Sequence, residues 1–204
     1  MTQQAMAAAI AEGRTSLGIE LGSTNIKACL IGPDHEVLAT GTHGWENQFV
    51  DRLWTYSEEA IWAGLQASFA ALSADVKKRY DVELTKVGAL GFSAMMHGYL
   101  AFDAAGKLLV PFRTWRNTNT ERAAAELTKT LGFNFPLRWS ASHLYQAVID
   151  NEPHVGNVAF FTTLSGFVHW RLTGKKVIGV GDASGMFPID AATHDYYAPM
   201  MKRF

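Results

Sequence analysis

The chain has 204 residues, of which 48% are hydrophobic, and its 18 basic and 19 acidic side chains leave a formal net charge of −1. This length fits one large domain or one and a half small ones, with enough apolar residues for a packed core. The balanced charge argues against a nucleic-acid partner, and no apolar stretch approaches the roughly 20 residues that span a bilayer.

The first 15 residues are rich in alanine, and we interpret them as an N-terminal extension or a frayed helix. They have no basic start and no long apolar block, unlike a signal peptide. The single cysteine, Cys29, cannot form an internal disulfide, which agrees with a reducing compartment. We therefore expect a cytoplasmic protein without a membrane partner.

Three short strands are predicted next. Residues 16–31 form two strands around the polar turn Gly22-Ser23-Thr24-Asn25, and residues 36–42 form a third strand after a Gly-Pro-Asp turn. The tight turns indicate an antiparallel meander.

A long helix follows the meander. Thr55 and Glu58 have the spacing of a capping box, and the apolar residues of one helical face are Ile61, Leu65, Phe69, Leu72 and Val76. Residues 86–92 are apolar on both faces, which predicts a central strand.

The rest of the chain alternates between strands and helices. We expect a hairpin at 99–102 and 107–110, a helix from the capping box of Thr118 and Glu121 to Gly132, helices at 141–151 and 164–172, and a strand at 158–161. No linker stands out, so we expect one compact unit.

The polar first turn is a candidate phosphate site. Glycine lets backbone N–H groups approach a phosphate closely, so Gly22, Ser23, Thr24 and Asn25 are expected to bind the nucleotide together with Lys27. Glu20, at the end of the first strand, is placed to hold Mg²⁺ through water. An ordinary hairpin explains the same residues equally well.

Two further segments are candidate sugar contacts. Met95-Met96-His97-Gly98 follows a buried strand, where His97 can donate to a substrate hydroxyl and Gly98 leaves room for a ligand. Trp115-Arg116-Asn117 precedes a helix N-terminus, where ligands are often held. The alternatives are a satisfied buried histidine and a simple helix entry with a packed tryptophan.

The element order resembles the actin-like, ribonuclease H-like ATPases, an α/β fold with a mixed sheet flanked by helices. The motifs, in order, resemble the FGGY family of carbohydrate kinases, especially its xylulokinase-like and ribulokinase-like members, over residues 16–204. The resemblance rests on Glu20-Leu21-Gly22-Ser23, Met95-Met96-His97-Gly98, Trp115-Arg116-Asn117, and Trp170 to Gly174 followed by Asp182-Ala183-Ser184-Gly185.

The resemblance implies ATP-dependent phosphorylation of a sugar hydroxyl, such as that of a ketopentose or related polyol, with ATP and Mg²⁺. It implies that residues 16–204 are the sugar-binding domain without its last segment and without the C-terminal ATP domain. The general-base aspartate is then expected downstream of Phe204, so this chain alone is expected to be inactive.

The sequence departs from the family pattern at several positions. Glu20 and Asn117 stand where aspartate is usual, and His143 stands where many members carry lysine. Asp182 matches an earlier loop of the family and is expected to cap or turn the chain. Three alternatives stay open: a non-catalytic sugar-binding or regulatory module, a half-kinase completed by a separate chain of about 30 kDa, and a homodimer.

Overall fold

The computed structural model describes residues 2–203; Met1 and Phe204, the outer bounds of the predicted extension and domain, lie outside the described residues. The chain divides into two compact units where the sequence predicted one. Unit 1 comprises residues up to 47 and 57–94, and unit 2 comprises residues 48–56 and those from 95 onward. The reason is that each unit has its own sheet, and a sheet needs its own apolar layer.

Unit 1 is built on a mixed sheet of four strands. These are β1 (Ser16–Leu21), β2 (Asn25–Ile31), β3 (Val37–Gly44) and β6 (Ala89–Ala94), in the order β3-β2-β1-β6. The first three strands form the predicted antiparallel meander, with Leu21 opposite Ile26, and β6 runs parallel to β1. The predicted mixed sheet is thereby confirmed.

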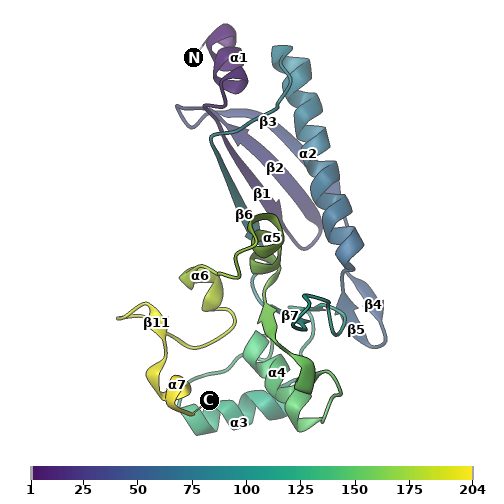
Figure 1. Ribbon diagram of the computed structural model, residues 1–204, viewed down its shortest axis with the longest axis vertical. Coiled ribbons are helices and arrows are strands. Elements are labelled where there is room, and N and C mark those ends of the chain that lie inside the picture. The colour runs from purple at the N-terminus through teal and green to yellow at the C-terminus, as the bar shows by residue number, and fades with distance from the viewer. Residues whose placement is uncertain (1, 204) are drawn as a thin grey trace. The chain divides into compact units, whose positions relative to one another are not determined.

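One face of this sheet is covered by the long helix α2 (Glu58–Tyr80), which runs beside β3 and β2 in Figure 1. Alternate residues of β1 and β2 are buried, as the period of two in a strand requires. The helix lies close to the sheet because small residues meet there. A side chain at Gly41 of β3 would overlap the backbone of Ser68 and Leu72.

Three details of unit 1 differ from the sequence predictions. The N-cap of α2 is Ser57, whose hydroxyl accepts from the Ala60 N–H at 3.1 Å, because Thr55 belongs to a strand. The buried helix face contains Gly64 and Ser68, while Leu65 is half-buried and Phe69 is exposed, since small residues allow the closest packing.

The third difference concerns β6. This strand was predicted to be central, but it lies at the edge of the sheet, and Leu90 is 50% exposed. Its apolar residues therefore have a neighbouring strand on one side alone within the described chain. The open edge offers unpaired backbone groups.

The N-terminal helix α1 (Gln3–Ala11) is formed rather than frayed. The Thr2 hydroxyl caps it, and Ala9 and Ile10 are buried. The Gln3 side chain donates to the Arg79 carbonyl at the end of α2 at 2.7 Å. Packing against α2 therefore stabilises α1, a short helix whose sequence alone does not predict a stable structure.

Unit 2 contains a three-stranded sheet of order β8-β7-β9 and a separate two-stranded hairpin, β4–β5. Its strands are β4 (Gln48–Val50), β5 (Leu53–Thr55), β7 (Gly98–Phe102), β8 (Arg113–Thr114), β9 (Phe160–Thr162), β10 (Ile189–Asp190) and β11 (Asp195–Tyr196). Its helices are α3 (Glu121–Leu131), α4 (Ser140–Ile149), the 3₁₀ turn η1 (Val155–Asn157), α5 (Leu164–Thr173), α6 (Val180–Ala183) and α7 (Ala198–Arg203).

Most predicted elements of unit 2 are confirmed with shifted ends. Gly132 and Gly174 end α3 and α5 in the left-handed conformation, with φ of 62° and 74°. The predicted strand 107–110 is reduced to a single bridge between Phe102 and Leu108. Thr120 rather than Thr118 is the N-cap of α3, because its hydroxyl donates to the Leu137 carbonyl and holds the chain there.

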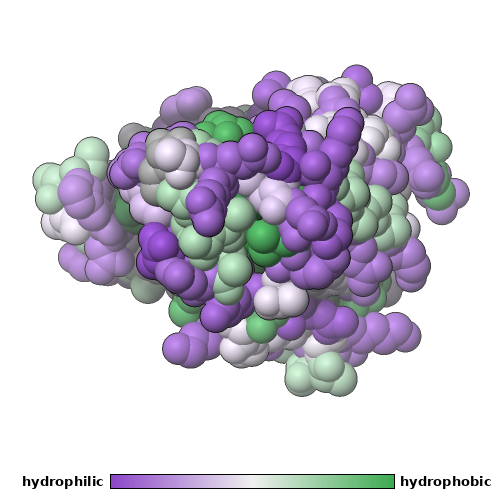
Figure 2. Space-filling model, turned by 90° about the horizontal axis from the view of Figure 1, so that it is seen from above, coloured by the Kyte–Doolittle hydropathy of each residue, from purple (hydrophilic) through white to green (hydrophobic). Residues whose placement is uncertain are grey.

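The face in Figure 2 is mostly hydrophilic, with apolar residues in small groups between polar ones. Among the described residues, no helix has both the length and the apolar character needed to cross a membrane.

Candidate functional site

The predicted phosphate turn joins β1 to β2 in unit 1. The Gly22 N–H donates to the Asn25 carbonyl at 3.0 Å, and a Cβ at residue 22 would lie 3.0 Å from that same oxygen. The tight turn therefore favours glycine, and Ser23 and Thr24 are exposed at its tip. The sequence brings these residues together locally, as predicted.

A tryptophan that sequence reasoning missed holds this turn. Trp45, just after β3, donates its indole N–H to the Gly22 carbonyl at 2.8 Å, and its backbone N–H donates to the Thr24 carbonyl at 3.1 Å. Its 7% exposure shows that the ring is packed as well. The turn therefore has a rigid support, which a phosphate site needs.

Glu20 and Lys27 lie beside the turn on the uncovered face of the sheet. They are cross-strand partners, with the Lys27 Nζ 3.8 Å from a Glu20 carboxylate oxygen, and both side chains are more than half exposed. An exposed pair of this kind adds little stability. Both charges are therefore accessible to a ligand.

The two predicted sugar segments meet at one end of the sheet of unit 2. Gly98 opens β7 and pairs with Thr114, the last residue of β8. Met95 to His97 precede this pair and Trp115 to Asn117 follow it, so both segments leave the sheet at the same end. The register of β7 and β8 thus brings together residues about 20 positions apart.

His97 occupies a left-handed backbone conformation, with φ of 70°, which is uncommon for a residue with a side chain. Its ring Nδ1 lies 3.0 Å from the carbonyl oxygen of Gly185. A carbonyl oxygen can only accept, so Nδ1 is the donor in this hydrogen bond, and a ring protonated on Nδ1 alone has Nε2 as an acceptor. Donation from His97 to a sugar hydroxyl stays a prediction, and it would use Nε2 of a ring that is protonated on both nitrogens.

Gly98 next to it is packed closely. A Cβ there would lie 2.6 Å from the Phe112 ring, and φ is 139°. The Gly98 carbonyl accepts from the Ser140 hydroxyl at the start of α4. The glycine makes room for the protein's own packing, and Met96 beside it is 44% exposed.

Arg116 stacks on two tryptophans. Its guanidinium carbon is 4.5 Å from the centroid of the Trp54 ring and 5.9 Å from that of Trp115. The guanidinium carbon of Arg138 also lies over Trp115, at 5.7 Å from the centroid of its ring. These cation–π contacts fix a positive charge at the exposed Arg116 beside the sugar segments. Trp54, in the β4–β5 hairpin, was missed because no sequence spacing links it to residue 116.

Asn117 is buried at 4% exposure, and its amide is used inside the protein. Its Oδ1 accepts from the Trp54 N–H at 2.9 Å, while its Nδ2 donates to the Trp54 carbonyl at 2.8 Å and to the Thr114 carbonyl at 3.0 Å. Both amide hydrogens are occupied, so Asn117 holds the hairpin to the sugar segment. A direct sugar contact by Asn117 stays a prediction.

A cluster of titratable side chains lies beneath β7. The Tyr99 hydroxyl is 3.0 Å from Nε2 of His154, and Glu152 accepts from Arg113, whose guanidinium carbon lies 5.5 Å from the Tyr99 ring centroid. Burial raises the pKa of Tyr99 to about 12 and lowers the pKa of His154. The cluster therefore supports β7 with an uncharged Tyr99 and with an ion pair between Arg113 and Glu152.

His143 belongs to this cluster and is fully buried in α4, stacked 6.4 Å from the Tyr99 ring. Neither ring nitrogen has a hydrogen-bond partner among the described residues. Burial, and secondarily the charge of Arg113, lower the pKa of His143 to about 3. The ring is therefore neutral, unlike the lysine that the family resemblance places here.

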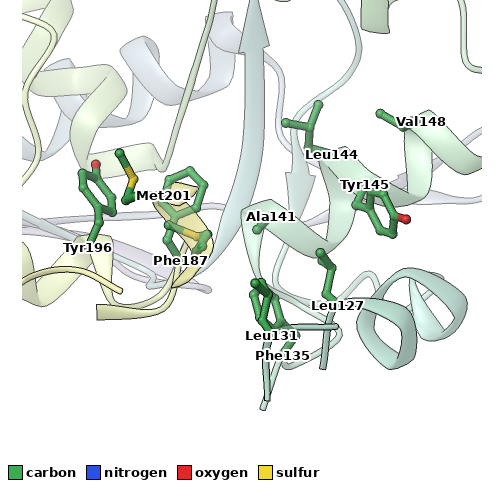
Figure 3. Close-up of a pocket in the computed structure, with 11 residues that line it drawn as sticks. Leu127, Leu131, Phe135, Ala141, Leu144, Tyr145, Val148, Phe187, Tyr196 and Met201 are labelled. Atoms are coloured by element: carbon green, nitrogen blue, oxygen red, sulfur yellow. The ribbon is translucent and has the colours of Figure 1, made fainter. Parts of the chain in front are cut away.

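A cavity of about 440 Å³ also lies in unit 2, and its lining is apolar. Figure 3 shows Leu127, Leu131 and Phe135 together with Ala141, Leu144, Tyr145 and Val148 of α4, and Phe187, Tyr196 and Met201 to one side of them. A sugar needs convergent polar groups for its hydroxyls. This cavity lacks them, so we do not assign the sugar to it.

The remaining acidic candidates have local roles. Asp190 accepts from the backbone N–H groups of Ala192 and Thr193 in a turn. Asp182 accepts from the hydroxyls of Thr163 and Ser165 rather than from a turn backbone. Within residues 2–203, no three His, Cys, Asp or Glu side chains cluster to hold a metal ion.

An antiparallel meander extended by a parallel strand and covered by a long helix, with a polar turn after its first strand, defines the actin-like ATPase fold. A xyloylose kinase from Brucella ovis superposes with a TM-score of 0.80 at 19% identity, covering 93% of this chain and 40% of that one. Plasmodium falciparum glycerol kinase with ADP gives a TM-score of 0.71 at 17% identity, with coverages of 93% and 40%. At these identities the likeness establishes the fold.

Sequence comparison identifies the family to which the chain belongs within this fold. The model of the N-terminal domain of the FGGY family of carbohydrate kinases matches residues 15–204, and the chain belongs to this family. Curated xylulose kinases from Escherichia coli (strain K12) and Klebsiella pneumoniae are 26% and 25% identical over 205 and 200 residues. Each alignment covers 91% of this chain and 39% of the relative, so the chain spans about two fifths of their length.

Proposed function

We propose that this chain is the sugar-binding part of a kinase that transfers a phosphoryl group from ATP to a hydroxyl of a ketopentose or related polyol. The family and the xylulose kinases among its relatives support this class of substrate. In this proposal Met95, Met96, His97, Gly98, Trp115, Arg116 and Asn117 form the sugar site.

The observation that carries the proposal is the conformation of His97. Its left-handed backbone costs roughly 1 kcal/mol or more, and such strain gathers at functional sites. Its ring is held by one nitrogen, at 3.0 Å from the Gly185 carbonyl, while the other nitrogen has acceptor capacity for a hydroxyl. The charge of Arg116 and the exposed Met96 flank the same end of the sheet.

We propose the turn of unit 1 as a phosphate contact. A Cβ at Gly22 would crowd the Asn25 carbonyl, so the glycine keeps the backbone accessible. Ser23, Thr24 and Asn25 would then face the phosphates with Lys27 beside them. Glu20 fits an Mg²⁺ ion held through water, because its carboxylate is more than half exposed. The bound metal would supply charge neutralisation at the phosphates.

The general base is assigned to no residue of this chain. Asp182, whose loop contacts His97, already accepts from two hydroxyls, which leaves its carboxylate committed to the protein. The chain would thus contribute binding and orientation, which are the larger part of phosphoryl-transfer catalysis. We expect the isolated chain to bind sugar without transferring phosphate.

Calorimetry with a panel of ketopentoses, polyols and sugar acids tests the sugar site. We expect binding by the wild-type chain and a loss of at least tenfold in affinity for His97→Ala. His194→Ala is the matched control, because His194 is also left-handed, with φ of 56°, and exposed in the same unit. Binding that is equal in all three proteins would remove His97 from the site.

Phosphoryl transfer is tested separately, with ATP, Mg²⁺ and each sugar that binds. Activity in the longest polypeptide expressed by the source cells, and none in residues 1–204, would support the kinase proposal. Sugar binding without transfer in both would favour the non-catalytic module instead. Light scattering of the same samples decides whether the chain forms a homodimer.

A further inference from the structure

The loop that contacts His97 is shaped to bring a carbonyl onto its ring. Gly185 is buried, and a Cβ there would lie 2.6 Å from the Met96 Cγ and 3.0 Å from the His97 Nδ1. Any side chain at residue 185 would therefore push against both candidate sugar residues. Because residue 185 has no side chain, its carbonyl oxygen lies 3.0 Å from the His97 Nδ1.

This loop is anchored by Asp182. The Asp182 carboxylate accepts from the hydroxyls of Thr163, the N-cap of α5, and of Ser165 in the first turn of that helix. A carboxylate near a helix N-terminus is further stabilised by the helix dipole. The anchor is thus made of charge-assisted hydrogen bonds, which are stronger than neutral ones.

Asp182 and Gly185 are joined by one helical turn. The Gly185 N–H donates to the Asp182 carbonyl at 3.0 Å, and the Met186 N–H donates to the Ala183 carbonyl at 2.9 Å. The Met186 carbonyl in turn accepts from the Ala141 N–H of α4 at 3.1 Å. The turn therefore connects the anchored Asp182 to the carbonyl that His97 contacts.

We propose that Asp182 is a positioning residue that, through the Gly185 carbonyl, holds the His97 ring in the tautomer with its proton on Nδ1, so that Nε2 accepts a hydrogen bond from a sugar hydroxyl. This inference rests on the proposed sugar site. An accepting Nε2 makes the sugar site specific for a substituent that donates a hydrogen bond. A substituent that accepts but cannot donate, such as fluorine, is rejected at that position.

Nitrogen-15 NMR of the labelled chain, without sugar, tests the tautomer directly. Long-range proton–nitrogen correlations distinguish a histidine protonated on Nδ1 from one protonated on Nε2, and His97→Ala identifies the signals of His97. We expect Nδ1 protonation in the wild type and a shift toward Nε2 protonation in Asp182→Ala. Asp190→Ala is the matched control, because it removes a turn carboxylate of the same unit.

Two milder variants keep the test decisive if Asp182→Ala does not fold. Ser165→Ala removes one of the two hydroxyls, and Gly185→Ala displaces the carbonyl without touching the anchor. Both should shift the tautomer in the same direction as Asp182→Ala. A wild-type ring protonated on Nε2, or a tautomer unchanged in every variant that folds, would overturn the proposal.

Binding of deoxyfluoro analogues then tests the consequence. For the hydroxyl that meets His97, replacement by fluorine should lower affinity about tenfold, the effect of losing one buried hydrogen bond. Asp182→Ala should weaken the parent sugar by a similar factor, and Asp190→Ala should not. If no sugar binds the wild type, the proposed function fails while the tautomer result stands by itself. If sugars bind and every fluorinated analogue binds equally well, the inference fails alone.

Discussion

Replacement of Asn117 by alanine should destabilise unit 2 substantially. The side chain makes three hydrogen bonds of 2.8 to 3.0 Å to backbone groups of Trp54 and Thr114, and it is 4% exposed. A net contribution of about 1 kcal/mol for each bond predicts a loss of about 3 kcal/mol in the free energy of unfolding. The Thr114 carbonyl keeps the Asn117 backbone N–H at 3.0 Å, so the unpaired backbone groups in this variant belong to Trp54.

Asn117→Asp keeps the size of the side chain and replaces its amide by a carboxylate. It places a carboxylate oxygen where Nδ2 now donates, 2.8 Å and 3.0 Å from two carbonyl oxygens. The repulsion and the burial of a charge should make this variant less stable than the alanine variant. A direct sugar role would instead let Asp preserve the fold, since the family usually carries aspartate here.

Urea unfolding followed by tryptophan fluorescence measures both losses, because Trp54 is a direct partner. Asn119→Ala is the control, since Asn119 is exposed two residues away and should change stability by less than about 0.5 kcal/mol. Equal midpoints for Asn117→Ala and Asn119→Ala would refute the structural role. Lost sugar affinity with unchanged stability would assign Asn117 to the sugar instead.

Three further predictions follow from packing, charge and turn geometry. Gly41→Ala should destabilise unit 1 by roughly 3 kcal/mol or more, because its Cβ would lie 2.9 Å from the Leu72 Cα; urea unfolding would contradict this if its midpoint did not move. His143 stays neutral when folded, with a pKa of about 3 against about 6.5 when unfolded. Below pH 6.5 the His143 ring binds a proton in the unfolded chain but not in the folded one. The contribution of His143 to the free energy of unfolding is therefore fully present above pH 6.5, and it falls by up to about 1.4 kcal/mol per pH unit between pH 6.5 and 3. His143→Leu should flatten that part of a pH–stability curve, and an equally steep curve would count against the prediction. Trp45→Phe keeps most of the ring but loses the donor to the Gly22 carbonyl, so it should cost about 1 kcal/mol. Hydrogen exchange at the Gly22 amide should become faster, and unchanged protection there would show that the indole does not hold the turn.

The elements that local chemistry determines were predicted well. The meander follows from alternation and from the Gly-Pro-Asp turn, and Gly132 and Gly174 end their helices because glycine adopts a left-handed backbone without strain. The N-caps were misplaced by two residues. Thr55 and Ser57 are equally good caps by residue type, and the β4–β5 hairpin decides between them by pairing Thr55 with Gln48.

The assignment of the site residues stays a prediction. The pairing of Gly98 with Thr114 brings the two predicted sugar segments to one end of a sheet. The roles within the site were not predictable, because Asn117 turns inward to Trp54 and the His97 ring meets Gly185, 88 residues away. No local pattern identifies a partner at that separation.

By itself, the sequence determined the family, the meander and the helices, and it supplied the residues proposed for the sugar site, because these depend on residue type and on short-range periodicity. Only the tertiary structure decided that β6 lies at a sheet edge and that α2 packs through Gly41 and Ser68. It alone brought the His97 Nδ1 to within 3.0 Å of the Gly185 carbonyl. Strand order, close backbone approach and hydrogen-bond direction depend on groups distant in the chain, and each is determined when those groups meet in the folded protein.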